Sequence, residues 1–377
     1  MICYKKNLFF CLLILSLSAT FFISCKSSST PTASQNTILT DANIVKLQAA
    51  ADQAISFTPG LVAYISVEGE GEIYITRGVS NLATNEPINA NNYFRIASNT
   101  KTFTSEAVLI LSDEGKIDLN KPISYYLPEL NIPSGDIITV RMLGNMTSGL
   151  FNYSADSTLM MNYYNAKGVL VYTPQQLVAA ACNHPLDFTP GSQYEYCNTN
   201  FIVLGLLITK VTGESVSQVF SEKIFQPLGM LNTYWPSSFY LPYPYTHGYS
   251  AKLGSLIDVT NWSPSWGDAA GQLVSKISDL KIWVKEISER NLLSAASKNE
   301  RYLWVDENVA GYPGVYGYGF GLMKFKNWIG HSGIIEGYNS QVYYNPVNKI
   351  TIIVYTNTDD KTPAYDLFYL FGNVLAP

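Results

Sequence analysis

The spacing of hydrophobic and polar residues changes from one segment of the chain to the next. Over residues 41–55 the apolar residues recur at helical spacing, which predicts an amphipathic helix with Asp41 as its N-cap. Two β-rich runs follow at residues 61–67 and 72–79, and the Glu-Gly-Glu-Gly stretch between them predicts a hairpin turn. The body of the chain is therefore expected to begin as helix, strand, strand.

The middle of the chain favours helices, and the end returns to strands. Helical runs occupy residues 102–114, 174–182, 200–212 and 216–225, and β-rich runs occupy residues 318–325, 338–345 and 350–356 before a last helical run at 364–374. This order predicts an α+β fold, in which one antiparallel sheet flanked by helices carries an inserted, mostly helical domain. Within one catalytic domain of residues 41–377, we assign 41–100 and 300–377 to the sheet part and about 101–299 to the helical part.

The first 24 residues have the pattern of an export signal. Lys5 and Lys6 precede an uncharged apolar run at residues 8–23, and Ser24-Cys25 is followed by a Ser/Thr-rich stretch. This arrangement resembles a bacterial lipoprotein cleavage site. We therefore expect residues 1–24 to be a signal peptide, Cys25 to carry the lipid that anchors the protein to the membrane, and residues 25–40 to be a tether. An uncleaved membrane anchor is the alternative, and both place the body outside the cytoplasm, in the cell envelope.

Composition narrows the possible partners. The 377 residues are 47% apolar and 14% charged, which suits a large globular core, and a net charge of -5 argues against a nucleic-acid partner. After Cys25 only Cys182 and Cys197 remain, and the sequence leaves open whether they form a disulfide or stay as thiols. Because no zinc-type spacing of Cys or His occurs, neither a metal nor a cofactor is expected.

Candidate chemistry begins with two Ser-x-x-Lys tetrads, at residues 98–101 and 278–281. A long helical pattern follows the first, so Ser98 is expected at a helix N-terminus, where an unpaired backbone N–H can face a developing oxyanion. Residues three apart are neighbours on a helix, which places Lys101 beside the Ser98 hydroxyl. A buried lysine with a lowered pKa can accept a proton. Taken alone, the tetrad also fits a capping serine followed by a solvated lysine.

Two further motifs favour the chemical interpretation. Tyr196-Cys197-Asn198 precedes a helical run, and His331-Ser332-Gly333 precedes a strand-rich segment. With Ser98-Asn99-Thr100-Lys101, these motifs resemble in type, order and spacing the serine β-lactamase and penicillin-binding protein superfamily. The likeness is greatest to the branch that holds D-Ala-D-Ala carboxypeptidases, class C β-lactamases and related esterases. It covers roughly residues 58–358, including the stretches at 140–150, 225–230, 270–275 and 317–321.

The resemblance implies a role for each residue. Ser98 would be the acylated nucleophile, Lys101 would activate it, and Tyr196 would relay the proton to the leaving group. Asn198 would hold the substrate amide and Lys101, while the backbone N–H of Ile334 would join that of Ser98 as an oxyanion donor. The residues implied in substrate binding are Asn198, His331, Ser332, Gly333 and Ile334.

A Ser-His-Asp triad is the rival mechanism. The chain contains only three histidines and no Gly-x-Ser-x-Gly motif, and His331 alone adjoins a plausible motif, in which it fits substrate binding better. The triad is therefore disfavoured.

Several positions depart from the family pattern. Met146 stands where many relatives have histidine, and Met323 stands where carboxypeptidase relatives have the arginine that grips a terminal carboxylate. Lys324 could replace that arginine only if it reached the site. Ile334 replaces a common threonine, which makes the predicted pocket more apolar.

These observations rank the possible functions. A D-Ala-D-Ala-type carboxypeptidase acting on cell-wall peptides comes first. An esterase, an amidase or a class C-like β-lactamase is the alternative, and a non-catalytic binding or sensing lipoprotein is a third. The expected partner is a small peptide, ester or β-lactam substrate, and the oligomeric state stays open.

Overall fold

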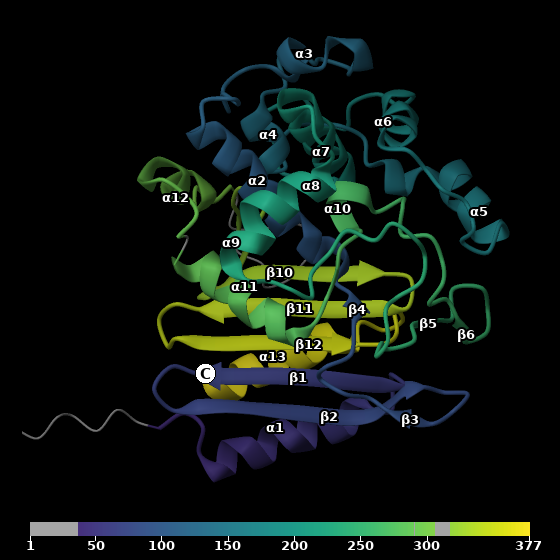
Figure 1. Cartoon of the computed structure of the whole chain (residues 1–377), viewed down its shortest axis with the longest axis vertical. Coiled ribbons are helices and arrows are strands. Elements are labelled where there is room, and N and C mark those ends of the chain that lie inside the picture. Colours follow the sequence, from purple (N-terminus) through teal and green to yellow (C-terminus); the bar gives the residue numbers. More distant parts are fainter. Residues whose placement is uncertain (1–36, 290, 306–316) are drawn as a thin grey trace, which may run out of the picture. The chain divides into compact units, whose positions relative to one another are not determined.

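The computed structural model describes residues 37–289, 291–305 and 317–377. Its centre is an eight-stranded antiparallel sheet of order β3-β2-β1-β12-β11-β10-β9-β8 (Figure 1). The strands from the beginning of the body meet those from its end where β1 pairs with β12, from Leu61 opposite Thr356 to Val67 opposite Ile350. The strands are β1 (Gly60–Val67), β2 (Gly71–Asn81), β3 (Glu86–Pro87), β8 (Gly317–Tyr318), β9 (Met323–Phe325), β10 (Trp328–Ile335), β11 (Tyr338–Asn345) and β12 (Ile350–Thr356). The predicted α+β architecture, one sheet with a helical insertion, is confirmed.

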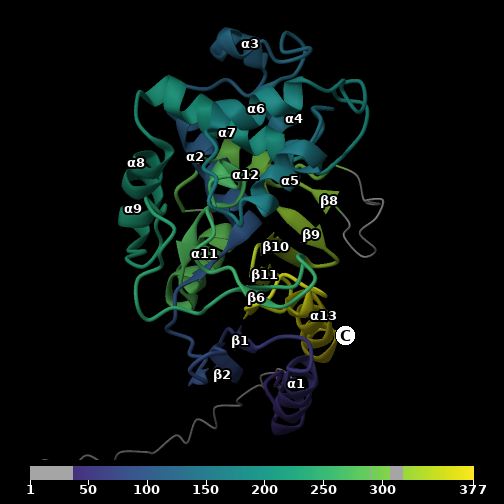
Figure 2. The ribbon, with the colours of Figure 1, turned by 90° about the vertical axis from the view of Figure 1, so that its right-hand side faces the viewer.

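Helices cover both faces of this sheet. The first helix, α1 (Asp41–Ala54), packs on the last, α13 (Pro363–Leu375), and α13 packs on β11 and β12 (Figure 2). The opposite face of these strands carries α11 (Ile277–Glu289) and the segment around Ser98. Because helices lie on both sides, β1 and β12 are almost continuously apolar and buried. The structure thus places α11 against the sheet, although the sequence pattern assigned it to the helical part.

The helical part is built around α7 (Asn198–Thr212), whose residues from Thr199 to Leu204 are all buried. Gly205 allows α10 (Asp268–Gly271) to approach α7 closely, since a Cβ at residue 205 would lie 2.6 Å from Ala269 Cβ. The other helices are α2 (Thr100–Asp113), α3 (Ile123–Tyr126), α4 (Val140–Gly144), α5 (Ser157–Asn165), α6 (Pro174–Cys182), α8 (Val216–Phe220), α9 (Gln226–Leu228) and α12 (Ala295–Arg301). Two short ladders pair β4 (Phe94–Arg95) with β7 (Val274–Ser275) and β5 (Tyr249–Ser250) with β6 (Ile257–Asp258).

Some predicted boundaries were wrong for local reasons. The N-cap of α1 is Thr40, not Asp41, because the Thr40 hydroxyl accepts the Asn43 N–H at 3.2 Å. The run at residues 318–325 is broken into β8 and β9 by a turn at Gly321, which has φ +73°. A Cβ at residue 321 would lie 2.4 Å from Ser105 Cβ, so this turn seats directly on α2.

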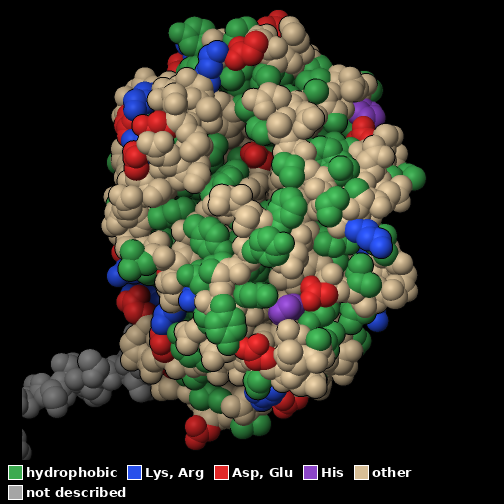
Figure 3. All heavy atoms as spheres, turned by 45° about the vertical axis from the view of Figure 1, so that its right-hand side comes forward, with side chains coloured by type: hydrophobic (Ala, Val, Ile, Leu, Met, Phe, Trp, Pro, Cys, Tyr) green, Lys and Arg blue, Asp and Glu red, His purple; other side chains and the backbone are tan. Residues whose placement is uncertain are grey.

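The surface of the body adds two observations. No single helix among the described residues is long and apolar enough to cross a membrane, and only α7 together with residues 216–228, bent by 83°, passes that test as a pair. Figure 3 shows a face on which hydrophobic and other uncharged side chains cover the middle, while most lysines and arginines lie toward its margins. This face presents a mainly uncharged surface.

Candidate active site

Ser98 lies in a short 3₁₀-helix, Ala97–Asn99, between β4 and α2. The preceding residue, Ala97, has φ +50°, a left-handed conformation that non-glycine residues seldom adopt. The Ala97 carbonyl is held by the Thr100 hydroxyl at 2.7 Å, and that hydroxyl in turn accepts the N–H of Leu273 at 3.1 Å. Surrounding structure therefore maintains a strained turn that fixes Ser98, as is common at reactive sites.

Lys101 lies one helical turn beyond Ser98 and is completely buried. Its Nζ donates to Ser98 Oγ at 2.9 Å and to the Ala270 carbonyl, at the end of α10, at 2.7 Å. Burial lowers the pKa of Lys101 well below its usual value, because the charged form is desolvated. A lysine that gives up its proton this readily, in contact with the serine hydroxyl, can act as the general base.

Tyr196 approaches the same lysine from the segment that leads into α7. The Nζ of Lys101 lies 5.0 Å from the centre of the Tyr196 ring. That ring also packs against Tyr318 at 6.2 Å and His331 at 6.0 Å between centroids. The motifs that contain Ser98, Tyr196 and His331 are far apart in the sequence but meet around Lys101. The proton-relay role of Tyr196 stays a prediction.

His331 is neutral and has a defined tautomer. Its Nδ1 lies 2.5 Å from the Ser332 carbonyl oxygen, and its Nε2 lies 3.2 Å from the Tyr318 hydroxyl. Burial, with the nearby Lys101 second, lowers the pKa of His331 to about 3. Because a carbonyl can only accept, Nδ1 carries the hydrogen and Nε2 accepts from Tyr318. Among the described residues no carboxylate is hydrogen-bonded to this ring, and they therefore place no Ser-His-Asp triad at His331.

The other two histidines each contact an aspartate away from Ser98. His184 pairs with Asp156 at 3.0 Å, and His247 pairs with Asp258 at 2.7 Å. Neither contacts a serine hydroxyl in the described part of the chain. That the mechanism depends on lysine rather than histidine stays a prediction.

Gly333 allows the sheet to touch the nucleophile segment. A Cβ at residue 333 would lie 2.3 Å from the Ile96 carbonyl oxygen and 2.7 Å from Ser340 Oγ. Ser340, opposite Gly333 on β11, donates to that same carbonyl at 3.1 Å and accepts from Asn99 Nδ2 at 2.9 Å. These contacts tie β10 and β11 directly to the turn that carries Ser98.

The second half of β10 is open on one side. Strand β9 pairs only with Trp328–Gly330, so within the described ranges residues 331–335 are hydrogen-bonded in a sheet to β11 alone. Such an edge can bind an extended substrate through backbone hydrogen bonds. The substrate-binding role of this edge stays a prediction.

A cavity of about 30 Å³ adjoins Ser98. Of the predicted substrate-binding residues, Asn198 and Ile334 border it, whereas His331, Ser332 and Gly333 do not. Its lining residues are Ser98, Tyr153, Asn198, Trp266, Gly267, Ala270, Gly271, Ile334 and Ile335.

Two predicted contacts differ in the structure. The Asn198 side-chain amide donates to Ser154 Oγ at 3.0 Å, and the oxygen that binds Lys101 comes from Ala270 instead, so the predicted contact between Asn198 and Lys101 was wrong. The Ser332 hydroxyl donates to the Met323 thioether at 3.6 Å on neighbouring β9. It therefore turns toward β9, although the family pattern places it in the substrate site.

Sequence reasoning gave no role to Ala270, Tyr153 or Trp266. The stretch that contains Ala270 resembles the family, but only the packing of α10 on α7 brings its carbonyl to Lys101. Tyr153 and Trp266 belong to loops without a periodic pattern and became visible only as walls of the cavity.

The positions that depart from the family pattern have structural explanations. Met146 is buried, and its thioether accepts the Cys197 N–H at 3.3 Å, so it supports the segment that carries Tyr196. Lys324 lies with its Nζ 5.7 Å from the Trp304 ring centre and does not border the cavity at Ser98. The structure therefore gives Lys324 no part in a carboxylate site.

The described residues include two of the cysteines named in the sequence analysis. Cys182 and Cys197 are free thiols, and burial raises the pKa of Cys197 to about 11. Cys25 lies outside the described residues. Over residues 37–289, 291–305 and 317–377, no three His, Cys, Asp or Glu side chains are grouped so that they could hold a metal ion.

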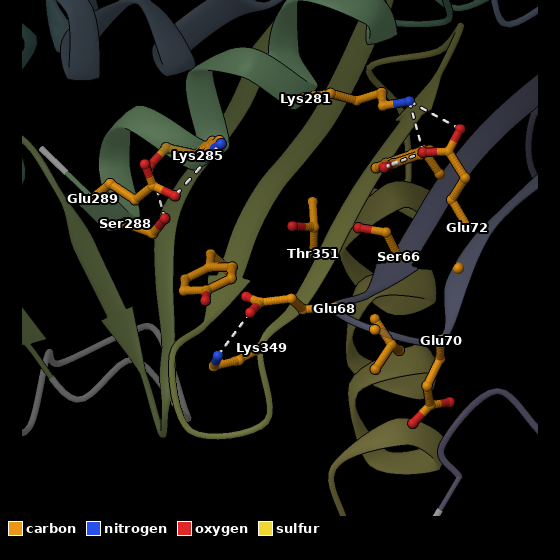
Figure 4. Close-up of a pocket in the computed structure, with 15 residues that line it drawn as sticks. Ser66, Glu68, Glu70, Glu72, Lys281, Lys285, Ser288, Glu289, Lys349 and Thr351 are labelled. Carbon is orange, nitrogen blue, oxygen red and sulfur yellow. Dashed lines mark hydrogen bonds and ion pairs between the residues drawn. The ribbon is translucent and has the colours of Figure 1, made fainter. Parts of the chain in front are cut away.

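A larger cavity, of about 660 Å³, shares no residue with the one at Ser98. Figure 4 shows Ser66 and Thr351 on the sheet, with Lys281 pointing from α11 toward Glu72 and Lys285 lying beside Glu289. Its lysines form ion pairs with carboxylates: Lys281 with Glu72, Lys285 with Glu289 and Lys349 with Glu68. The lysines of this cavity are therefore already paired with carboxylates.

Comparison with known proteins assigns the family. A model of the beta-lactamase family matches residues 48–370, which are most of the chain and include the motifs at Ser98, Tyr196 and His331. The chain belongs to this beta-lactamase family. It is thus a member of the serine hydrolase superfamily, and its Lys101 Nζ lies 2.9 Å from Ser98 Oγ.

The chain is also similar to individual relatives and solved structures. A D-stereospecific amidohydrolase from Streptomyces sp. has a similar structure, with TM-score 0.78, 31% sequence identity and coverage of 86% of this chain and 97% of that one. A D-aminopeptidase of Gluconobacter oxydans is 25% identical over 324 residues, which are 85% of this chain and 60% of that protein. Protein flp of Staphylococcus aureus is 24% identical over 309 residues, 79% of this chain and 60% of that protein. The chain thus spans about 60% of the length of these curated relatives.

Proposed function

We propose that this protein is an acyl-serine amidohydrolase that cleaves amides or short peptides of D-configured amino acids. The observation that carries the proposal is the 2.9 Å contact between Ser98 Oγ and the buried, readily deprotonated Lys101. The D-configuration is supported by the likeness to a D-stereospecific amidohydrolase and a D-aminopeptidase.

The geometry supports a two-step reaction. Neutral Lys101 takes the hydroxyl proton as Ser98 Oγ bonds to the substrate carbonyl carbon, and the backbone N–H groups of Ser98 and Ile334 hold the oxyanion. The C–N bond breaks as the amine receives a proton through Lys101 and Tyr196, which leaves an ester on Ser98. Water then attacks this ester, and the acid product leaves with Ser98 regenerated. The free edge of β10 would align the substrate backbone.

An amidase fits this site better than a D-Ala-D-Ala carboxypeptidase. A carboxypeptidase must hold a terminal carboxylate, for which a cationic side chain is the usual partner. No lysine or arginine is among the described residues that border the cavity at Ser98, and residues 306–316 contain neither. The carboxypeptidase therefore stays a prediction, and esterase or β-lactamase activity is the next alternative on the same scaffold.

Two measurements on the purified full-length protein test the proposal. Intact mass after incubation with a penicillin should show one acyl adduct, which Ser98→Ala abolishes. Ser278→Ala is the matched control, because it alters the second Ser-x-x-Lys tetrad, whose Lys281 is bound to Glu72 on the sheet. Ammonia release should then be faster from D-alaninamide than from L-alaninamide. Equal turnover by wild type and Ser98→Ala, or a preference for the L-amide, would contradict the proposal.

We also propose that the protein is exported and anchored at the cell envelope through Cys25. The support is the apolar run at residues 8–23 followed by Ser24-Cys25. The protein should partition with membranes and leave them in Cys25→Ala, whereas Cys11→Ala, within the apolar run, should stay membrane-bound. A Cys25→Ala protein that remains in the membrane would instead indicate an uncleaved anchor.

A further inference from the structure

A further cavity adjoins α10, the short helix that holds Lys101. It measures about 230 Å³, and Asp268, the first residue of α10, forms part of its wall. The cavity shares no residue with the one at Ser98, although the neighbouring residues Gly267 and Ala270 border that one. Two separate cavities thus meet the same short segment of the chain.

The carboxylate of Asp268 has no cationic partner within the described ranges. Its Oδ1 accepts the N–H of Ala269, the next residue, at 2.7 Å, and no described lysine, arginine or histidine forms an ion pair with it. Burial raises the pKa of Asp268 to about 6, yet at pH 7.5 the group is still mostly ionised. Its backbone has φ +35°, a left-handed conformation that costs further free energy. A partly desolvated charge without a partner favours the binding of a cation.

The other walls of this cavity suit an organic cation. Leu206, from α7, and Val216, from α8, are apolar and can contact an alkyl group. Trp235 also borders the cavity, and indole rings attract cations. The hydroxyl groups of Thr209 and Ser217 add acceptors, because a primary ammonium group has three N–H donors and one carboxylate does not use them all. A few polar groups on otherwise apolar walls are typical of a small-molecule site.

A metal ion fits this cavity less well. Ca²⁺ and Mg²⁺ take about six or more oxygen ligands, and Asp268 supplies the one carboxylate among the described residues that line the cavity. Nowhere in residues 37–289, 291–305 and 317–377 do three His, Cys, Asp or Glu side chains come together as a metal ion needs. A monovalent organic cation, which needs one anionic partner and an apolar surface, matches these walls better.

We propose that the cavity at Asp268 binds a small organic cation with a primary ammonium group, which forms an ion pair with the Asp268 carboxylate. The site lies outside the reaction at Ser98 and does not depend on the proposed function. One short helix links it to Lys101, because the carbonyl of Ala270, two residues beyond Asp268, accepts from Lys101 Nζ at 2.7 Å.

Ethylammonium chloride is the probe, and saturation-transfer NMR on the full-length protein at pH 7.5 measures its binding. A ligand of three non-hydrogen atoms reaches a Kd of about 1 mM at best, so the titration runs to about 100 mM, against sodium chloride of equal ionic strength. Wild type should transfer saturation to the ethyl protons in a saturable way. In Asp268→Asn the Kd should rise by about tenfold or more, because the charged partner is lost.

Asp136→Asn is the matched control, because it makes the same change of charge at an exposed aspartate that does not border this cavity. It should keep the wild-type Kd. A wild-type signal that does not saturate, or an equal Kd in wild type and Asp268→Asn, would overturn the proposal.

A second measurement uses wild type alone, so it does not depend on whether a variant folds. Ethylammonium keeps its charge between pH 7.5 and pH 5, whereas Asp268 takes up a proton near pH 6. The Kd should therefore rise below pH 6, toward about tenfold per pH unit. A Kd that stays constant over this range would overturn the ion pair.

Magnesium chloride separates an organic-cation site from a metal site. At about 10 mM it should lower the ethylammonium signal no more than sodium chloride of equal ionic strength does. Complete loss of the signal in magnesium alone would overturn the organic cation in favour of a metal ion. Absence of a penicillin adduct, which would overturn the proposed function, has no bearing on these measurements.

Discussion

The replacement Gly333→Ala tests how closely the sheet must approach the nucleophile. The new Cβ would lie 2.3 Å from the Ile96 carbonyl oxygen and 3.1 Å from Ala97 Cβ. Neither neighbour can yield easily, because Asn99 and Ser340 both donate to that carbonyl and Ala97 already has a left-handed φ of +50°. The strain must therefore be relieved by moving β10 away from the turn at Ser98.

The size of the effect follows from these distances. Ordinary contact begins at 3.4 Å, so β10 must retreat by about 1 Å from a contact of 2.3 Å. Overpacking of this kind costs about 1–3 kcal/mol, which for a body of this size lowers Tm by about 1–4 °C. Because Ile334 is the next residue, its N–H would shift relative to Ser98. A misplacement of about 1 Å can slow an enzymatic step by about 10²-fold.

The assay combines thermal unfolding with the rate of penicillin adduct formation on Ser98. Gly372→Ala in α13 is the control, since its Cβ would approach nothing closer than Trp328 Nε1 at 3.4 Å. That replacement should leave acylation unchanged and can stabilise the helix by up to about 1 kcal/mol. Wild-type Tm and wild-type acylation in Gly333→Ala would refute the argument that β10 must touch the turn.

Three further predictions follow from the buried ionisable groups. Lys101→Met should slow acylation of Ser98 by about 10²–10⁴-fold, measured as adduct formation, because the proton acceptor is lost; unchanged acylation would assign the base elsewhere. The pKa of His331 in the folded protein is about 3. As pH falls below about 6.5, the unfolded chain therefore binds a proton that the folded chain does not, and the free energy of unfolding decreases by up to about 1.4 kcal/mol per pH unit. Between pH 7 and pH 5 the Tm of His331→Gln should therefore fall less than the Tm of wild type. An equal fall in Tm for the two proteins would contradict this prediction. Burial raises the pKa of Asp268 to about 6, so its contribution to stability falls as pH rises from about 4 to 6. Asp268→Asn should therefore unfold at a higher temperature than wild type at pH 7.5 but not below about pH 4, and an advantage that persists at low pH would argue for a different cause.

Local features of the chain were predictable from sequence alone. The helix Pro174–Cys182 and the strands Tyr338–Asn345 and Ile350–Thr356 have the predicted bounds, because their periodicity and their flanking turn residues are both local signals. The contact between Ser98 and Lys101 was predictable for the same reason, since three positions along a helix bring two side chains together wherever that helix lies.

Tertiary structure decided the features that join distant segments. The Ala270 carbonyl reaches Lys101 only because Gly205 lets α10 pack closely on α7. Asn198 donates to Ser154 Oγ, and the indole of Trp266 donates to Glu336, which directly follows β10. Such contacts depend on how elements pack, which no local pattern encodes. The sequence alone thus determined the fold class and the contact between Ser98 and Lys101, while packing decided which groups surround that pair, because the contacts between distant segments depend on how the elements meet in space.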